Sequence, residues 1–283
     1  MRTARRVATP AASARPVAGG DSPGRDAREG SPARSAGRAT AVATEPRPAF
    51  YALELGSWRD YVTLLHPPYT LWHLSYVVLG AALAPAVHYD RLAAALLAFF
   101  LALGIAAHAL DELNGRPLST RIPSAALGSL AAASLAGAVG LGVLGSIVVS
   151  PWLLVFVALG AFFVLAYNQE LFRGRFHSDF WFALAWGAFP LLTAYWTMAE
   201  RLEPAAAAGA LAAFALSLAQ RTLSSRVRAI RRRVRDIAGV VTYADGSAEA
   251  IDRRWALAAD ERALMLLAAA MVTLSVAALL ARV

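Results

Sequence analysis

The chain has 283 residues, of which 58% are hydrophobic and 16% charged, whereas soluble domains average about 45–50% apolar and about 25% charged residues. All 27 basic residues are arginine, and with 19 acidic residues they give a net charge of +8. The absence of cysteine excludes disulfides, thiolate metal sites, cysteine nucleophiles and palmitoyl anchors. This composition predicts an integral membrane protein.

The first 49 residues differ in composition from the rest of the chain. Residues 1–49 contain no aromatic residue and consist mainly of Arg, Ala, Ser, Gly, Pro and Thr, a composition that cannot bury enough apolar surface to offset chain entropy. They also lack the apolar stretch of a secretory signal peptide. We predict a disordered cytoplasmic tail over residues 1–49 and a membrane domain over residues 50–283, which begins with a helix at the headgroup level.

Long apolar runs alternate with short polar segments in the membrane domain. Each run is close to the roughly twenty residues that cross the hydrocarbon core, and every backbone polar group at that depth must pair within its own helix. We therefore predict an all-α fold, a polytopic transmembrane helical bundle of about seven spanning helices. The predicted spans are 67–87, 91–110, 124–147, 151–168, 180–199, 204–222 and 261–281.

The arginines are distributed unevenly over the segments that connect these spans. With the N-terminus inside, the outer segments hold only Arg91, Arg201 and Arg282, and all other arginines lie in the tail and the inner segments. Positively charged loops stay on the cytoplasmic side of a membrane. We therefore predict that the N-terminus and the polar loops are cytoplasmic, and that the chain resides in the plasma membrane of a prokaryote.

The first inner loop begins at His108 and concentrates polar side chains at the end of the second span. At helical spacing, His108, Asp111 and Glu112 fall on neighbouring positions of one face, and Arg116 and Arg121 follow. Carboxylate oxygens suit a divalent cation, and flanking arginines suit the phosphate that the cation bridges. The alternative is that the two carboxylates pair with these arginines at a solvated helix end.

The second inner loop, residues 167–190, combines ionisable residues with aromatic ones. Tyr167 ends one predicted span, and Arg175, His177 and Asp179 lead into the next. An aromatic belt at the membrane interface explains the aromatic residues of this loop. It does not explain three types of ionisable residue within a short stretch.

The third inner segment, residues 221–245, begins with seven arginines: Arg221, Arg226, Arg228, Arg231, Arg232, Arg233 and Arg235. An apolar stripe of Val227, Ile230, Val234, Ile237 and Val241 accompanies them at helical spacing. We predict an amphipathic helix on the cytoplasmic leaflet, where residues 221–235 attract anionic lipid headgroups with about 1 kcal/mol per arginine. The chain has no recognised nucleic-acid fold, so nucleic acid is not an expected partner.

These loops resemble those of the UbiA superfamily of intramembrane prenyltransferases. The family places an Asp-rich motif and an Arg-Pro-Leu stretch after its second helix, where this chain reads DELNGRPLSTRIP, and a tyrosine and a basic residue after its fourth helix, where Tyr167 and Arg175 stand. The resemblance covers roughly residues 58–281. It implies Mg²⁺ as the cofactor, and membrane lipid, a prenyl diphosphate and a lipophilic acceptor as partners.

The chain departs from the family at both Asp-rich motifs. Only Asp111 remains of the first motif, with Glu112 beside it, and the sequence AQRTLSSRVR in place of the second contains no carboxylate. The resemblance implies catalytic roles for Asp111, Glu112 and Tyr167 and a reduced metal site of Asp111, Glu112 and Asn114. The residues expected to hold diphosphate are Asn114, Arg116, Arg121, Arg175, Gln220, Arg221 and Arg226.

Two functions remain open on these observations. The first is Mg²⁺-assisted transfer of an isoprenoid from a prenyl diphosphate to an acceptor. The second keeps the fold without catalysis and makes the chain a lipid-binding or partner-docking scaffold with a basic cytoplasmic face. A small transporter is disfavoured because no predicted span carries an unpaired acid near its midpoint.

Overall fold

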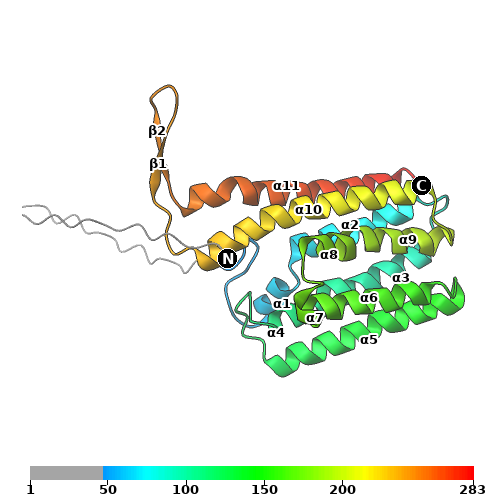
Figure 1. Ribbon diagram of the computed structural model, residues 1–283. Coiled ribbons are helices and arrows are strands. Elements are labelled where there is room, and N and C mark those ends of the chain that lie inside the picture. The colour runs from blue at the N-terminus through cyan, green and yellow to red at the C-terminus, as the bar shows by residue number, and fades with distance from the viewer. Residues whose placement is uncertain (1–46) are drawn as a thin grey trace, which may run out of the picture. The chain divides into compact units, whose positions relative to one another are not determined.

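The computed structural model describes residues 47–283, so nearly all of the predicted tail lies outside the described residues. The described part is mostly helical and contains one short β-hairpin. Figure 1 shows the long helices running side by side along one direction, with the hairpin projecting from one end of the bundle. The prediction of a helical bundle is confirmed for these residues.

An irregular segment over residues 47–57 precedes the first helices. α1 (Trp58–Leu64) is short, and α2 (Pro67–Leu83) begins with two prolines, which suit the first turn of a helix because their missing N–H groups would have no helical partner there. α3 (Tyr89–Phe99) continues through the π-helix η1 (Phe100–Ala107) into α4 (His108–Leu113). A polar loop then leads to α5 (Ser124–Val148) and α6 (Leu153–Asn168).

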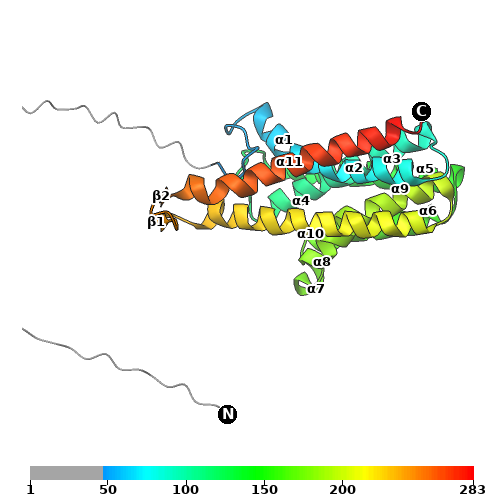
Figure 2. The ribbon, with the colours of Figure 1, turned by 90° about the horizontal axis from the view of Figure 1, so that it is seen from above.

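The second half of the bundle repeats the use of a π-helix. After the short α7 (Leu171–Gly174), a continuous helical segment consists of α8 (Asp179–Ala183), η2 (Leu184–Ala188) and α9 (Phe189–Ala199). α10 (Pro204–Arg233) and α11 (Arg253–Leu280) are the two longest α-helices of the described residues, and they lie side by side in both views (Figures 1 and 2). Between them, β1 (Gly239–Thr242) pairs antiparallel with β2 (Ala248–Ile251).

Each predicted span coincides with a helical segment. Four of these segments are long and apolar enough to cross a membrane, namely Tyr89–Leu113, Ser124–Val148, Pro204–Arg233 and Arg253–Leu280. Large apolar side chains also face outward, including Ile147 at 78% and Leu211 at 71% exposure, which is typical of a surface that contacts lipid. These features are those of an integral membrane protein, and the count of about seven spans stays a prediction.

Small side chains allow close contact between helices in the centre of the bundle. A Cβ atom at Gly80 of α2 would collide with the carbonyl oxygen of Leu191 and lie 3.0 Å from the Cβ atom of Ala194, both in α9. Next to this contact, Trp72 donates a hydrogen bond to the Tyr76 hydroxyl at 2.6 Å, and the Ser217 hydroxyl of α10 lies 3.1 Å from the same oxygen. Close backbone approach and buried side-chain hydrogen bonds hold helices together in lipid, where the hydrophobic effect between them is weak.

Pro190 explains one long-range contact of this core. Proline has no N–H, so Pro190 cannot donate a hydrogen bond to the carbonyl of Trp186, four residues earlier. His73 of α2 supplies the donor instead, with 2.8 Å between its Nδ1 atom and the Trp186 oxygen. The π-helix η2 ends just before this proline, and the missing helical bond becomes a bond between two helices.

The basic segment at 221–245 differs from the prediction. It is not a separate interfacial helix, because α10 runs without a break from the predicted span 204–222 to Arg233. Its stripe residues Val227 and Ile230 pack against Leu257 and Leu264 of α11, so protein covers the surface that we expected lipid to cover. Residues 239–251 form the β-hairpin in place of further helix.

Candidate functional site

A polar pocket with a volume of about 220 Å³ lies at the end of the bundle from which the hairpin projects. The start of α2, the junction of η1 and α4, the end of α6 and the second half of α10 line it, and residues 48–51 of the irregular segment complete it. Its ionisable and polar residues are Tyr51, His66, Tyr69, His73, His108, Asp111, Tyr167, Asn168, His177, Gln220, Arg221, Arg228 and Arg232.

Three arginines of α10 form the basic part of this pocket. Arg221, Arg228 and Arg232 are seven and four residues apart, a spacing that brings side chains to the same helix face. Arg221 pairs with Asp179 at 3.0 Å, and its guanidinium lies 5.1 Å from the centre of the Phe182 ring. No carboxylate of residues 47–283 lies within ion-pair distance of Arg228 or Arg232. We call these three residues the arginine side.

Three histidines from α2 and the η1–α4 junction form a second part of the lining, which we call the histidine side. The Nδ1 atoms of His66, His73 and His108 lie 2.8, 2.8 and 3.1 Å from the backbone oxygens of Leu64, Trp186 and Gly104. The rings of His66 and His108 have centroids 4.0 Å apart. Burial and the neighbouring His108 hold the pKa of His66 well below its usual range, so this imidazole is neutral at physiological pH.

Two buried polar atoms in the pocket have no hydrogen-bond partner within the described residues. They are the hydroxyl of Tyr167, which is 7% exposed, and the Oε1 atom of Gln220, which is 2% exposed. The Tyr167 ring stacks on His177, with centroids 4.4 Å apart, and contacts Trp186. Buried polar atoms are rarely left without a partner, so these two atoms point to a ligand or water in the pocket.

Four of the residues expected at the site from sequence do line this pocket. They are Asp111, Tyr167, Gln220 and Arg221. The Asp111 carboxylate has neither an ion pair nor a hydrogen bond among residues 47–283, although it is half-buried. The structure therefore brings together one or two residues from each of the first, second and third inner segments.

Glu112 has a structural role instead of the expected metal-binding one. Its side chain is 1% exposed, and its carboxylate accepts hydrogen bonds from the backbone N–H groups of Leu118 and Thr120 and from the Thr120 hydroxyl, at 2.8–2.9 Å. It thereby ties the end of α4 to the following loop. Three protein donors occupy the Glu112 carboxylate, and neither Arg116 nor Arg121 is among them.

The other expected diphosphate ligands also lie outside the pocket lining. Arg116 donates to the backbone oxygens of Thr120 and Ile122 and to Ser124. Asn114 donates to the backbone oxygen of Asn168 at 3.2 Å. Arg226 pairs with Asp260 of α11 at 3.3 Å, and the side chains of Arg121 and Arg175 are exposed.

The donor set of the pocket does not fit a magnesium site. Mg²⁺ requires near-octahedral oxygen ligands, usually including one or two carboxylates, and Asp111 is the single carboxylate in this lining. Within residues 47–283, no group of three or more His, Asp or Glu side chains is arranged to hold a metal ion. The expected ligands Glu112 and Asn114 are both engaged elsewhere.

The pocket also contains residues that were not among the expected site residues, chiefly His66, His73, Arg228 and Arg232. The sequence does indicate that the three arginines share a helix face, because Arg221, Arg228 and Arg232 are separated by seven and then four residues. A similar signal exists for the histidines, because His66 and His73 are also seven residues apart. Spacing of this kind selects one helix face, but it does not say what that face meets.

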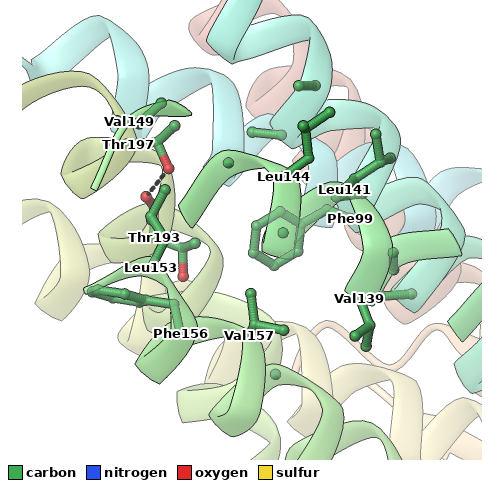
Figure 3. A pocket seen from close by; sticks show the side chains of 18 of the residues that line it. Phe99, Val139, Leu141, Leu144, Val149, Leu153, Phe156, Val157, Thr193 and Thr197 are labelled. Atoms are coloured by element: carbon green, nitrogen blue, oxygen red, sulfur yellow. Dashed lines mark hydrogen bonds between the residues drawn. The ribbon is translucent and has the colours of Figure 1, made fainter. Parts of the chain in front are cut away.

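A second cavity, of about 240 Å³, lies between α3, α5, α6 and α9 and is lined mainly by apolar side chains (Figure 3). Phe99 and Val157 project into it, and Thr193 and Thr197 lie at one edge, where the Thr197 hydroxyl bonds the Thr193 backbone oxygen at 2.8 Å. The two cavities share no lining residue. They are neighbours, because Phe99 of the apolar cavity packs against the cluster that contains Tyr167 and Trp186 of the polar pocket.

Comparisons of the chain with protein-family models, curated protein sequences and solved structures found no match.

Proposed function

We propose that the chain is a UbiA-like integral membrane prenyltransferase that binds a prenyl diphosphate in the polar pocket and transfers its isoprenoid to an acceptor. The observation that supports it best is the arginine side, where Arg228 and Arg232 face the pocket without a carboxylate partner in the described residues. Arg228 is half-buried and Arg232 is exposed, so both guanidinium groups are accessible to a ligand. Guanidinium groups bind phosphate oxygens through paired, charge-assisted hydrogen bonds, so a diphosphate is the ligand class that completes this site.

The chemistry follows from where charge develops. The bond between C1 of the isoprenoid and the diphosphate oxygen breaks, and the electron pair leaves with the diphosphate, whose added charge the arginine side stabilises. In this proposal the aromatic rings of Tyr167 and Trp186, both in the pocket lining and with centroids 4.6 Å apart, stabilise the allylic cation. An acceptor atom then bonds to C1 and loses its proton. No step requires magnesium, since the pocket does not fit it.

The apolar cavity suits the isoprenoid chain. Its lining is mainly Leu, Val, Phe, Ala and Gly side chains, which suit a hydrocarbon. Its polar members are Asp90, Arg91, Thr193 and Thr197, and both threonine hydroxyls donate hydrogen bonds to backbone oxygens of their own helix. It adjoins the Tyr167–Trp186 cluster at Phe99, so a chain whose diphosphate lies at the arginine side can extend towards it. In this proposal seven helical segments span the plasma membrane of a prokaryote, and the N-terminus and the polar pocket face the cytoplasm.

The test is binding of radiolabelled geranylgeranyl diphosphate to the full chain in detergent. We expect Arg228→Gln with Arg232→Gln to weaken binding by at least about 100-fold, since two charge-assisted hydrogen bonds of about 1.5–3 kcal/mol each are lost and 1.4 kcal/mol is a factor of ten. Arg233→Gln is the matched control, because Arg233 is exposed on the same helix and outside the pocket. We expect EDTA to leave binding unchanged.

Three results would contradict the proposal. They are no binding by the unaltered chain, equal binding by the double variant and the control, and loss of binding in EDTA. Turnover is followed as inorganic diphosphate released in the presence of a membrane lipid extract that supplies acceptors.

The second candidate, a lipid-binding or docking scaffold, is favoured by the missing metal ligands. It predicts that Asp111→Ala has no effect, and that neutralising Arg231, Arg232 and Arg233 changes the association of the chain with anionic lipid or a partner. Part of the basic surface that it requires is already occupied, because Arg226 and Arg231 pair with Asp260 and Glu261 of α11. Lipid docking would then depend on exposed residues such as Arg233 and Arg235.

A further inference from the structure

The proposed binding of a diphosphate uses the arginine side and gives no role to the histidine side, which lines the same pocket. Among residues 47–283, no hydrogen bond uses the Nε2 atom of His66, His73 or His108, although all three residues line the pocket. A backbone carbonyl can only accept a hydrogen bond, so the Nδ1 atom of each ring carries the proton. In a neutral imidazole the Nε2 atom then bears a lone pair, which makes it a hydrogen-bond acceptor.

Other free acceptors share the pocket with these histidines. The Oε1 atom of Gln220 is buried without a partner, and the Asp111 carboxylate has none within the described residues. A deprotonated diphosphate also offers only acceptor oxygens. A diphosphate therefore accepts hydrogen bonds from the arginine side, but it donates none to the histidine side, Gln220 or Asp111. A ligand that completes the whole pocket must bring hydrogen-bond donors as well as phosphate.

We propose that the histidine side is the subsite for a hydroxyl-bearing acceptor, whose O–H donates a hydrogen bond to a histidine Nε2 atom. His108 is the best placed of the three, because it is half-buried whereas His66 and His73 are buried, and because it precedes Asp111 by one turn. This inference rests on the proposed function and names the chemical class of its second substrate.

The hydroxyl also gives the transfer a balanced proton step. The acceptor oxygen forms a bond to C1 of the isoprenoid while the bond from C1 to the diphosphate oxygen breaks and its electron pair leaves with the diphosphate. The acceptor proton passes to the Nε2 atom of His108, which becomes an imidazolium. The Asp111 carboxylate in the same pocket offers that cation an opposite charge.

Two phosphate esters that differ only in their hydroxyl groups test this assignment. Glycerol 3-phosphate and propyl phosphate both carry a phosphate for the arginine side, but only the first carries hydroxyl donors. Isothermal titration of the full chain in detergent should show about 2- to 12-fold tighter binding of glycerol 3-phosphate, since a hydrogen bond contributes about 0.5–1.5 kcal/mol and 1.4 kcal/mol is a factor of ten.

The variant His108→Phe keeps a ring against His66 and removes the acceptor nitrogen. We expect it to abolish the preference for glycerol 3-phosphate and to leave the dissociation constant of propyl phosphate unchanged, which also shows that the pocket is intact. His108→Gln, which retains an acceptor oxygen, should restore part of the preference.

Several outcomes would overturn the inference. They are equal affinity of the two esters for the unaltered chain, an undiminished preference in His108→Phe, and no binding of glycerol 3-phosphate where geranylgeranyl diphosphate binds. The proposed function survives each of these. It fails separately if geranylgeranyl diphosphate itself does not bind.

Discussion

Replacing Glu112 by alanine should destabilise the protein strongly, because this carboxylate ties α4 to the next loop. The change removes three hydrogen bonds of 2.8–2.9 Å to a charged acceptor and leaves the N–H groups of Leu118 and Thr120, two buried residues, without a partner. A hydrogen bond to a charged group contributes about 1.5–3 kcal/mol, and water entering the space recovers part of the sum. We expect the free energy of unfolding to fall by about 3–5 kcal/mol.

Reversible unfolding in mixed micelles, followed by tryptophan fluorescence, measures this loss. Glu170→Ala is the control, because the Glu170 side chain is 56% exposed and its charged neighbour is His177 at 4.0 Å. We expect the control to stay within about 0.5 kcal/mol of the unaltered protein. If Glu112→Ala were as stable as the control and yet unable to bind geranylgeranyl diphosphate, the loop-anchoring role would be refuted in favour of a ligand-binding one.

Three further predictions concern the folded state. Gly80→Ala should force α2 and α9 apart at the Leu191 carbonyl and lower the free energy of unfolding by about 1–3 kcal/mol. Gly128→Ala is the control and should be neutral or stabilising, because a Cβ atom at Gly128 meets nothing within 4 Å. Equal free energies of unfolding for the two variants would contradict the close contact. Asp60→Ala should lower the free energy of unfolding by about 2–4 kcal/mol, because the buried Asp60 carboxylate accepts hydrogen bonds from the N–H groups of Gly56 and Arg121 at 2.9 Å. Faster proteolysis of residues 47–57 and 116–123 would show that these segments have been released. The lowered pKa of His66, caused by burial and then by His108, means that the unfolded chain takes up a proton at this residue more readily than the folded one. The contribution of neutral His66 to the free energy of unfolding is therefore complete above about pH 6.5, which is the pKa of a histidine in the unfolded chain. This contribution is lost as the pH falls below 6.5, by up to about 1.4 kcal/mol per pH unit. His66→Phe should flatten the fall of the unfolding free energy between pH 6.5 and 5, and an unchanged slope would show that His66 is protonated in the folded state.

Much of the fold could be predicted from the sequence, because the pattern of apolar runs is a local property. Each run from 67–87 to 261–281 contains a helix, since a long apolar segment in lipid must satisfy its own backbone. The first residues of two helices were also predicted, because α2 begins at Pro67 and α10 at Pro204, where the predicted spans begin. The β-hairpin was not predicted, because Val241 continued the apparent helical stripe that begins at Val227.

The candidate site was predicted only in part. Asp111, Tyr167, Gln220 and Arg221 were chosen by their place in loops after helices, and they do share one pocket. The histidines at positions 66 and 73 were passed over because each stands alone in an apolar stretch. Their tautomer depends on which carbonyls they meet, and for His73 that carbonyl belongs to Trp186, far along the chain.

The sequence by itself determined that this protein is a helical, membrane-type chain whose ionisable residues gather in a few segments. Only the tertiary structure decided which of those residues act together. The side chains of neighbouring residues point in different directions because successive residues on a helix are rotated by about 100°. Asp111 thus faces the pocket while Glu112 binds the loop, and Arg228 faces the pocket while Arg226 pairs with Asp260. Composition reports how many charges a segment carries, but the direction of each side chain depends on the helices around it.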